Sequence, residues 1–157
     1  MERPGPLHQH RTKDMAPYAS TTKVPVDQSR SEIERTLARY GATAFAYAAQ
    51  DGEVAIMFEA NGRRVRFRLN VLVKKPGEND ASRKTREQDT RRRWRALLLC
   101  IKAKLESVNS RIETFEEAFL AHVVMPDGMT VGQHAIKGIE AAYSGRPMPP
   151  LLPGPGK

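Results

Sequence analysis

Several residue types are scarce in this 157-residue sequence, and each scarcity excludes a class of protein. The single cysteine, Cys100, rules out an intrachain disulfide, so an intracellular setting is expected. No apolar run approaches the ~20 residues that span a membrane, and the N-terminus lacks the apolar segment of a secretory signal. We therefore expect one cytoplasmic domain without a membrane partner.

Sequence signals for catalysis are also scarce. The four histidines and Cys100 show no metal-ligand spacing, and no glycine-rich phosphate loop or serine nucleophile elbow occurs. Asp51 and Glu53 lie close together, but Asp51 is explained by a turn. Cys100, between Leu99 and Ile101, is expected to be a small core residue. We predict no catalytic residue, metal or cofactor. Enzymatic activity is left open, with a metal-dependent nuclease as the alternative to a binding protein.

Positive charge is in excess, and one segment of the chain holds it. The net charge of the whole chain is +8. Residues 63–104 contain 15 Lys and Arg against four Asp and Glu, whereas the segments on either side are slightly acidic. Such a concentration is typical of a protein that binds a polyanion, and equally of a solvated helix face.

Both ends of the chain differ from the middle. Residues 1–20 are rich in Pro, Gly and His without periodicity, so we expect them to be disordered. Residues 1–14 are interpreted as an extension upstream of a start at Met15. Five prolines and three glycines in residues 145–157 predict an extended tail over 146–157, which is a docking strap, a disordered end or a polyproline-type ligand. Residues 21–145 are predicted to form a single domain.

The domain is predicted to begin with a helix. Ser29 and Glu32 fit a capping box, Asp27 is an alternative cap, and Gly41 is expected to end the helix. The segment TTKVPV before it is a candidate edge strand, because Pro25 forbids a central one.

A three-stranded antiparallel meander follows, and its turns fix its register. Asp51-Gly52 and Asn61-Gly62 are both strong signals for two-residue hairpins. Closing them produces six apolar pairs that all fall on one face: Phe45–Phe58, Tyr47–Ile56, Ala49–Val54, Val54–Leu69, Ile56–Phe67 and Phe58–Val65. The other face receives Ala44, Ala46, Ala48, Ala55, Met57, Glu59, Arg64, Arg66 and Arg68. On this face Glu59 lies opposite Arg64.

The rest of the domain is predicted to be helical. Apolar residues at helical spacing predict a long helix from about residue 83 to residue 109, which should cover the apolar face of the meander. A shorter helix around Phe115 and Phe119 and a last helix from Thr130 to Gly145 complete the domain. The fold class is therefore α+β: a helix, a three-stranded meander, then a long helix and two shorter helices packed on one sheet face.

The candidate binding residues are basic side chains of the third strand, the following loop and the start of the long helix. They are Arg64, Arg66, Arg68, Lys74, Lys75, Arg83, Lys84, Arg86, Arg91, Arg92, Arg93 and Arg95. Arginine near a helix N-terminus opposes the helix dipole, and a bound anion would offset that cost. The register sends the aromatic residues to the apolar face, so contacts to phosphates are expected rather than base stacking. Trp94 is interpreted as a core residue.

Three strings of the sequence resemble a group of small, uncharacterised proteins encoded by bacteriophages and prophages. The strings are YASTTKVPVDQSRSEIERTLARYGA, RRRWRALLLCIKAKLESV and FEEAFLAHVVMPDGMTVG. The resemblance covers residues 15 to about 153 and implies a bacterial cytoplasmic setting, without a known activity or binding residues.

Two functions are therefore carried forward from the sequence. The first is non-catalytic binding of nucleic acid, single- or double-stranded, by a phage-type accessory protein that contacts phosphates through its basic strand and helix. The alternative is a protein-interaction module, either a homo-oligomer or an inhibitor of a host protein, that uses the alanine-rich sheet face and the proline-rich tail.

Overall fold

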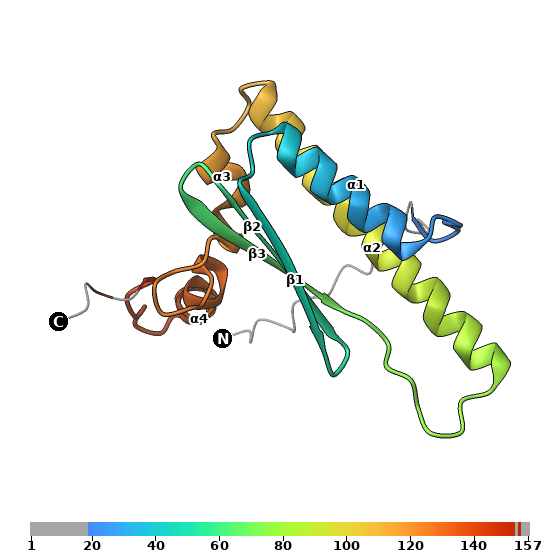
Figure 1. Cartoon of the computed structure of the whole chain (residues 1–157). Coiled ribbons are helices and arrows are strands. Elements are labelled where there is room, and N and C mark those ends of the chain that lie inside the picture. Colours follow the sequence, from blue (N-terminus) through green and yellow to red (C-terminus); the bar gives the residue numbers. More distant parts are fainter. Residues whose placement is uncertain (1–18, 153, 155–157) are drawn as a thin grey trace.

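The computed structural model describes residues 19–152 and 154 and has an α+β fold (Figure 1). The elements in chain order are α1 (Val26–Arg39), β1 (Ala44–Gln50), β2 (Glu53–Ala60), β3 (Arg63–Asn70), α2 (Asp80–Asn109), α3 (Phe115–Phe119), the short 3-10 helix η1 (Leu120–His122) and α4 (Val131–Tyr143). The fold class expected from the sequence is confirmed.

The three strands form one antiparallel sheet in the order β1-β2-β3, with the predicted register. Phe45 pairs with Phe58 and Phe58 with Val65, as the two hairpin turns require. The first residue of each turn has positive φ, 48° at Asp51 and 50° at Asn61, and the glycine after it does as well. Asn-Gly and Asp-Gly tolerate these angles, which give the twist that antiparallel strands need.

Both α1 and α2 cover the apolar face of the sheet, where the core lies. Figure 1 shows the two helices running side by side on one side of the strands. The buried core takes residues from all of these elements: Ile33 and Leu37 of α1, Val54, Ile56, Phe58 and Ala60 of β2, Val65 and Phe67 of β3, and Trp94, Leu97, Leu98, Ile101 and Leu105 of α2. The long helix was expected here, but α1 shares the task.

The short helix α3 closes the β3 end of the core. The ring of Phe119 meets Phe58 edge to face at a centroid distance of 5.8 Å and Phe67 at 6.3 Å. After η1 the chain runs along the edge of β3, where the Val124 N–H donates to the Arg64 carbonyl at 2.8 Å. The β3 edge is therefore covered by the protein's own chain.

The last helix, α4, lies on the other side of the sheet from α1 and α2 (Figure 1). It contacts η1, and its Gln133 accepts a hydrogen bond from the Arg66 guanidinium at 3.0 Å. Arg66 belongs to the outer face of β3, so α4 flanks that face rather than the apolar one. The expectation that all the later helices pack on one sheet face is therefore wrong for α4.

Three local predictions are wrong. The helix α1 begins at Val26 after Pro25, with no side-chain cap, and Ser29 is buried inside it instead of capping it. The candidate strand TTKVPV is a turn residue and four irregular residues, and its last residue, Val26, begins α1. Cys100 is exposed, not a core residue, because it lies on the side of α2 that faces away from the sheet.

The two ends of the chain are described only in part. The predicted disorder of residues 1–20 lies almost wholly outside the described residues, although Ala19 is buried and Gln88 of α2 donates to the carbonyl oxygens of Ser20 and Thr22. In the tail, residues 146–152 form no helix or strand, and Leu151 lies against Gly138 of α4. No helix of the described residues is long and apolar enough to cross a membrane.

Candidate nucleic-acid interface

The three arginines of β3 lie on the outer face of the sheet, as alternation predicts. Arg64 and Arg68 are exposed, and each forms an ion pair with a glutamate of β2: Arg64 with Glu59 at 3.2 Å and Arg68 with Glu53 at 3.5 Å. Arg66 is half-buried beneath α4, with its Nε atom buried and unpartnered among the described residues. The sheet arginines are thus largely engaged by the protein itself.

The arginines of α2 are also paired, mostly with carboxylates of the same helix or of α1. Arg83 pairs with Asp80 at 3.0 Å, and Arg92 and Arg93 share Asp89 at 2.5 and 2.7 Å. Arg95 pairs with Glu32 of α1 at 3.2 Å. Such pairs reduce the net field of the helix but leave its positive excess in place.

Arg86 has the best-defined ion pair of the group. Its Nε and one of its terminal nitrogens donate to the two carboxylate oxygens of Glu78, at 2.9 and 3.0 Å. The hydrogen bonds from Arg86 lower the pKa of the Glu78 carboxyl, although burial opposes them. This two-pronged contact fastens the loop before α2 to the second turn of the helix.

Only three of the twelve candidate residues have no hydrogen-bond or ion-pair partner among the described residues. They are Lys74, Lys75 and Lys84. All three are exposed, two in the loop and one in the first turns of α2. Arg91 resembles them in charge, because its only contact is the neutral side-chain amide of Gln88 at 2.9 Å.

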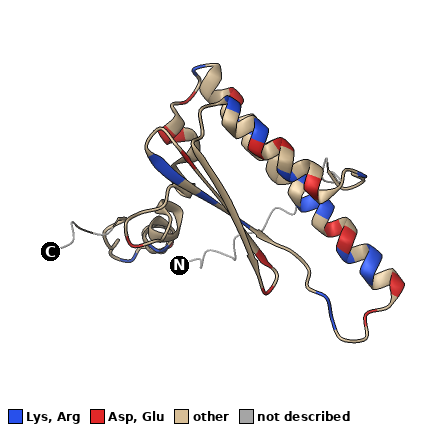
Figure 2. Ribbon diagram, viewed as in Figure 1, with Lys and Arg blue, Asp and Glu red and all other residues tan. Residues whose placement is uncertain are grey.

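The candidate residues do not form one surface. Arg64, Arg66 and Arg68 point away from the apolar face, which α2 covers, so the sheet arginines and the helix arginines lie on opposite sides of the sheet. Figure 2 shows the two groups of basic residues separated along β3 and along α2. The sequence already implies this separation, because it places the three strand arginines on the outer face and the long helix on the apolar face.

The first half of α2 stands apart from the core. No residue from 80 to 93 is buried, and the first buried residue of the helix is Trp94. Figure 1 shows this half of α2 running past the end of α1 and diverging from the sheet. We call residues 71–93, the loop and the first half of α2, the cationic arm. It contains eight Lys and Arg against four Asp and Glu.

A wide cavity of about 890 Å³ lies under the arm, between the loop, the first turns of α2 and the hairpin that joins β1 to β2. Its lining carries both charge signs, from Lys75 and Arg86 to Glu53 and Asp51. Because acidic and basic groups alternate around it, the cavity itself does not concentrate a field that would hold an anion. The outward side of the arm is the more cationic surface.

The cationic arm contains no aromatic residue that could stack on a base. Trp94 is 4% exposed and belongs to the core, as predicted. Tyr47 is half-exposed, but the Arg30 guanidinium lies 4.5 Å from the centre of its ring. Contacts by the arm would therefore be made to phosphates rather than by stacking.

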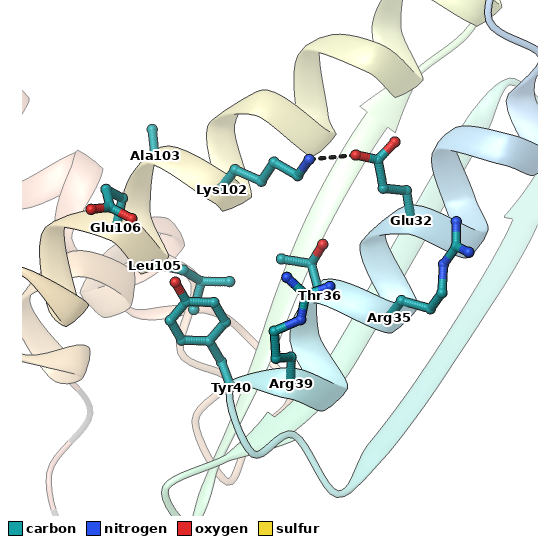
Figure 3. A pocket seen from close by; sticks show the side chains of 9 residues that line it. All are labelled: Glu32, Arg35, Thr36, Arg39, Tyr40, Lys102, Ala103, Leu105 and Glu106. Carbon is teal, nitrogen blue, oxygen red and sulfur yellow. Dashed lines mark hydrogen bonds and ion pairs between the residues drawn. The ribbon is translucent and has the colours of Figure 1, made fainter.

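A second cleft, of about 670 Å³, lies between α1 and α2 and was not foreseen from the sequence. Figure 3 shows Lys102 and Glu32 reaching toward each other across it, in an ion pair that lowers the pKa of Glu32. Arg35 and Arg39 line the same cleft. Because Glu32 also holds Arg95, the main result of this arrangement is to join the two helices.

The described residues contain no group of three or more His, Cys, Asp or Glu side chains placed to hold a metal ion. Asp89 lies partly buried, and burial raises its pKa, yet hydrogen bonds from Arg92 and Arg93 outweigh this and lower it. The Asp89 carboxyl is therefore held in its charged form as a partner of two arginines, not placed as a metal ligand.

Comparison of this chain with known protein families, with curated proteins and with solved structures finds no match. The resemblance to phage and prophage proteins stays a prediction, and function has to be argued from the site alone.

Proposed function

We propose that the protein is a non-catalytic nucleic-acid-binding accessory protein, of phage type as the sequence resemblance suggests, that contacts backbone phosphates through its cationic arm. The observation that carries this proposal is the polar first half of α2. A helix that is polar on all sides contributes little to a core, and residues 80–93 are held in helical form by their own ion pairs and the Asn79 cap. Their excess positive charge is therefore not used by the core, and a phosphate backbone lying along the arm would neutralise it.

The arm, rather than the sheet, is the stronger candidate because of where uncompensated charge lies. Lys74, Lys75 and Lys84 have no carboxylate partner among the described residues, and the Arg86–Glu78 contact holds the loop lysines beside the helix. The sheet arginines would each have to leave a glutamate or Gln133 to reach a phosphate. Replacing the carboxylate partner of an arginine by a phosphate would add little binding free energy.

The test is a fluorescence-anisotropy titration of labelled single-stranded and duplex DNA at several salt concentrations. Binding by the wild type should weaken steeply as salt rises, since each phosphate contact adds about −0.9 to the slope of log K against log salt for duplex DNA. Replacing all three unpaired lysines of the arm (Lys74→Ala, Lys75→Ala and Lys84→Ala) should lower affinity about tenfold or more. The slope should also become shallower by roughly the number of phosphates that these lysines bind in the wild type.

A matched control removes the same charge elsewhere. Arg35→Ala, Arg39→Ala and Arg63→Ala together change three exposed arginines that have no ion-pair partner among the described residues and lie outside the arm. This variant should bind within about twofold of the wild type. Equal losses of affinity in the two variants would show that only net charge matters and would contradict a specific role for the arm. Absence of any binding by the wild type at low salt would contradict nucleic-acid binding altogether.

A further inference from the structure

The free edge of β1 is the least protected part of the sheet. Six of its seven residues are exposed, and its sequence, AFAYAAQ, has no charge and no proline. The ladder with β2 is unbroken from Ala44 to Gln50. Edge strands of soluble proteins usually carry a charge, a proline, a bulge or a covering segment, because unpaired backbone groups at an edge pair readily with another chain. β1 has no charge and no proline, and no segment among the described residues pairs with its free edge.

The hairpin geometry shows which backbone groups face outward along this edge. A two-residue hairpin closes on a hydrogen-bonded pair, so Gln50 bonds to Glu53 and, by alternation, Ala48 and Ala46 also bond to β2. The Val71 N–H donates to the Gly52 carbonyl at 2.7 Å, which fits the same alternation on the β3 side. The N–H and C=O groups of Phe45, Tyr47 and Ala49 therefore point away from the sheet.

We propose that β1 pairs in antiparallel fashion with β1 of a second copy of this chain, which joins two three-stranded sheets into one continuous sheet. A two-fold axis at Tyr47 would place Tyr47 opposite its own counterpart and Phe45 opposite Ala49 of the second copy. These are the residues whose backbone groups point outward, so each pair can exchange both of its hydrogen bonds. The backbone geometry and the two-fold register agree.

The side chains of β1 fit this partner on both faces. On the apolar face, each large Phe45 would meet a small Ala49, and the two Tyr47 rings would form an aromatic cross-strand pair at the axis. On the outer face Ala46 would meet Ala48. No charge in either strand lies opposite a like charge. A foreign strand would need the same alternation of large and small residues, which β1 itself already has. For this reason we identify the occupant as a second copy.

The helix beside this edge is compatible with the pairing. Arg30 covers the Tyr47 ring, and Asp27 pairs with Arg30 at 3.4 Å. Glu34 lies one turn further along the same side of α1. Because this side carries both charge signs, two antiparallel α1 helices can place acidic groups opposite basic ones.

The test is the oligomeric state of the full chain by sedimentation equilibrium, over protein concentrations up to about 200 µM. The wild type should form a dimer as its concentration rises. Ala46→Lys with Ala48→Lys would place lysines opposite each other across the two-fold axis, and this variant should be a monomer throughout. Ala46→Glu with Ala48→Glu should likewise be a monomer. An equimolar mixture of the two variants should form a heterodimer, because opposite charges then face each other.

Two further variants act as controls. Ala96→Lys with Ala103→Lys makes the same change at two exposed positions of α2 and should dimerise as the wild type does. Ala49→Pro removes an outward N–H without touching the β2 ladder, so it should stay folded by circular dichroism and be a monomer. A wild type that stays a monomer would overturn the proposal and leave the edge to a strand of another protein. Lysine variants that still dimerise, or a mixture that stays monomeric, would also overturn it. None of these changes touches the cationic arm, so DNA binding is tested separately.

Discussion

The two edges of the sheet differ in almost every respect. The edge of β3 is covered by residues 122–124, where Val123 bridges to Val65 and the Val124 N–H donates to the Arg64 carbonyl. β3 also carries three arginines on its outer face, at positions 64, 66 and 68. β1 has no charge, and no segment among residues 19–152 pairs with its free edge. The β3 edge thus has both a covering segment and charged residues, whereas the β1 edge has neither among the described residues. The sheet is therefore suited to pairing with another strand along β1.

The β3 side and the β1 side of the sheet should differ most in how much stability is lost when an aromatic residue is replaced by alanine. Phe119 is fully buried against Phe58 and Phe67, so Phe119→Ala should cost about 3–5 kcal/mol in the free energy of unfolding. Tyr47 is 48% exposed, and Tyr47→Ala should cost only about 1–2 kcal/mol. Urea denaturation at low protein concentration, where association does not contribute, measures both. Equal costs would contradict the view that the β1 side is open.

Matched prolines at the two edges provide a second, smaller contrast. Val124→Pro removes the N–H that donates to the Arg64 carbonyl and should lower stability by about 1–3 kcal/mol. Ala49→Pro removes an N–H that bonds to nothing within one copy, and should change monomer stability by no more than about 0.5 kcal/mol. The same urea titrations compare them. If Ala49→Pro were the more damaging change, the assignment of the outward backbone groups would be wrong.

The smallest expected effect is a dependence of stability on pH, which arises from His122 at the covered β3 edge. Burial lowers the pKa of His122 below its usual 6.5, and the charge of Lys104 lowers it further, while the hydrogen bond to the Arg66 backbone raises it. The unfolded chain therefore binds a proton more readily than the folded one. Stability is full above pH 6.5 and falls as the pH drops from there through the folded pKa.

Thermal unfolding at about pH 7.5 and about pH 5.5 tests this, since the lowered pKa values of Glu32 and Asp89 act at lower pH. The wild type should melt at a lower temperature at the acidic pH. The His122 ring stacks on the Phe67 ring with a centroid distance of 4.0 Å. His122→Phe keeps an aromatic ring at this position and should show a smaller difference in melting temperature between the two pH values. An identical pH dependence in both proteins would show that His122 is not the group responsible.

The sheet could be predicted from the sequence because its determinants are local. Asp51-Gly52 and Asn61-Gly62 fix the turns, and the alternation of large apolar residues selects one register out of several. The start of α1 could not be predicted in this way. Ser29 and Glu32 form a plausible capping pattern, but the burial of Ile33, Leu37 and Ser29 against other elements outweighs it, and the helix extends back to Pro25.

The candidate site was predicted residue by residue but not as a surface. Alternation correctly placed Arg64 and Arg68 on the outer face, and helical spacing correctly placed Trp94 in the core. The sequence does not indicate which residues pair with the basic side chains. Arg95 and its partner Glu32, like Arg66 and its partner Gln133, lie more than 60 residues apart in the chain. The same distance in sequence hid the cleft between α1 and α2.

The sequence by itself determined the elements of this protein, the register of its sheet and the segment that holds its excess charge, since turn chemistry, periodicity and composition act over a few residues. Only the tertiary structure decided that α1 shares the apolar face with α2 and that α4 meets Arg66 on the outer face. It also decided that three lysines are left without partners among the described residues, and that the described residues cover one sheet edge and not the other. Those outcomes depend on which distant segments meet when the apolar faces are buried, because hydrophobic burial fixes position without regard to order in the chain.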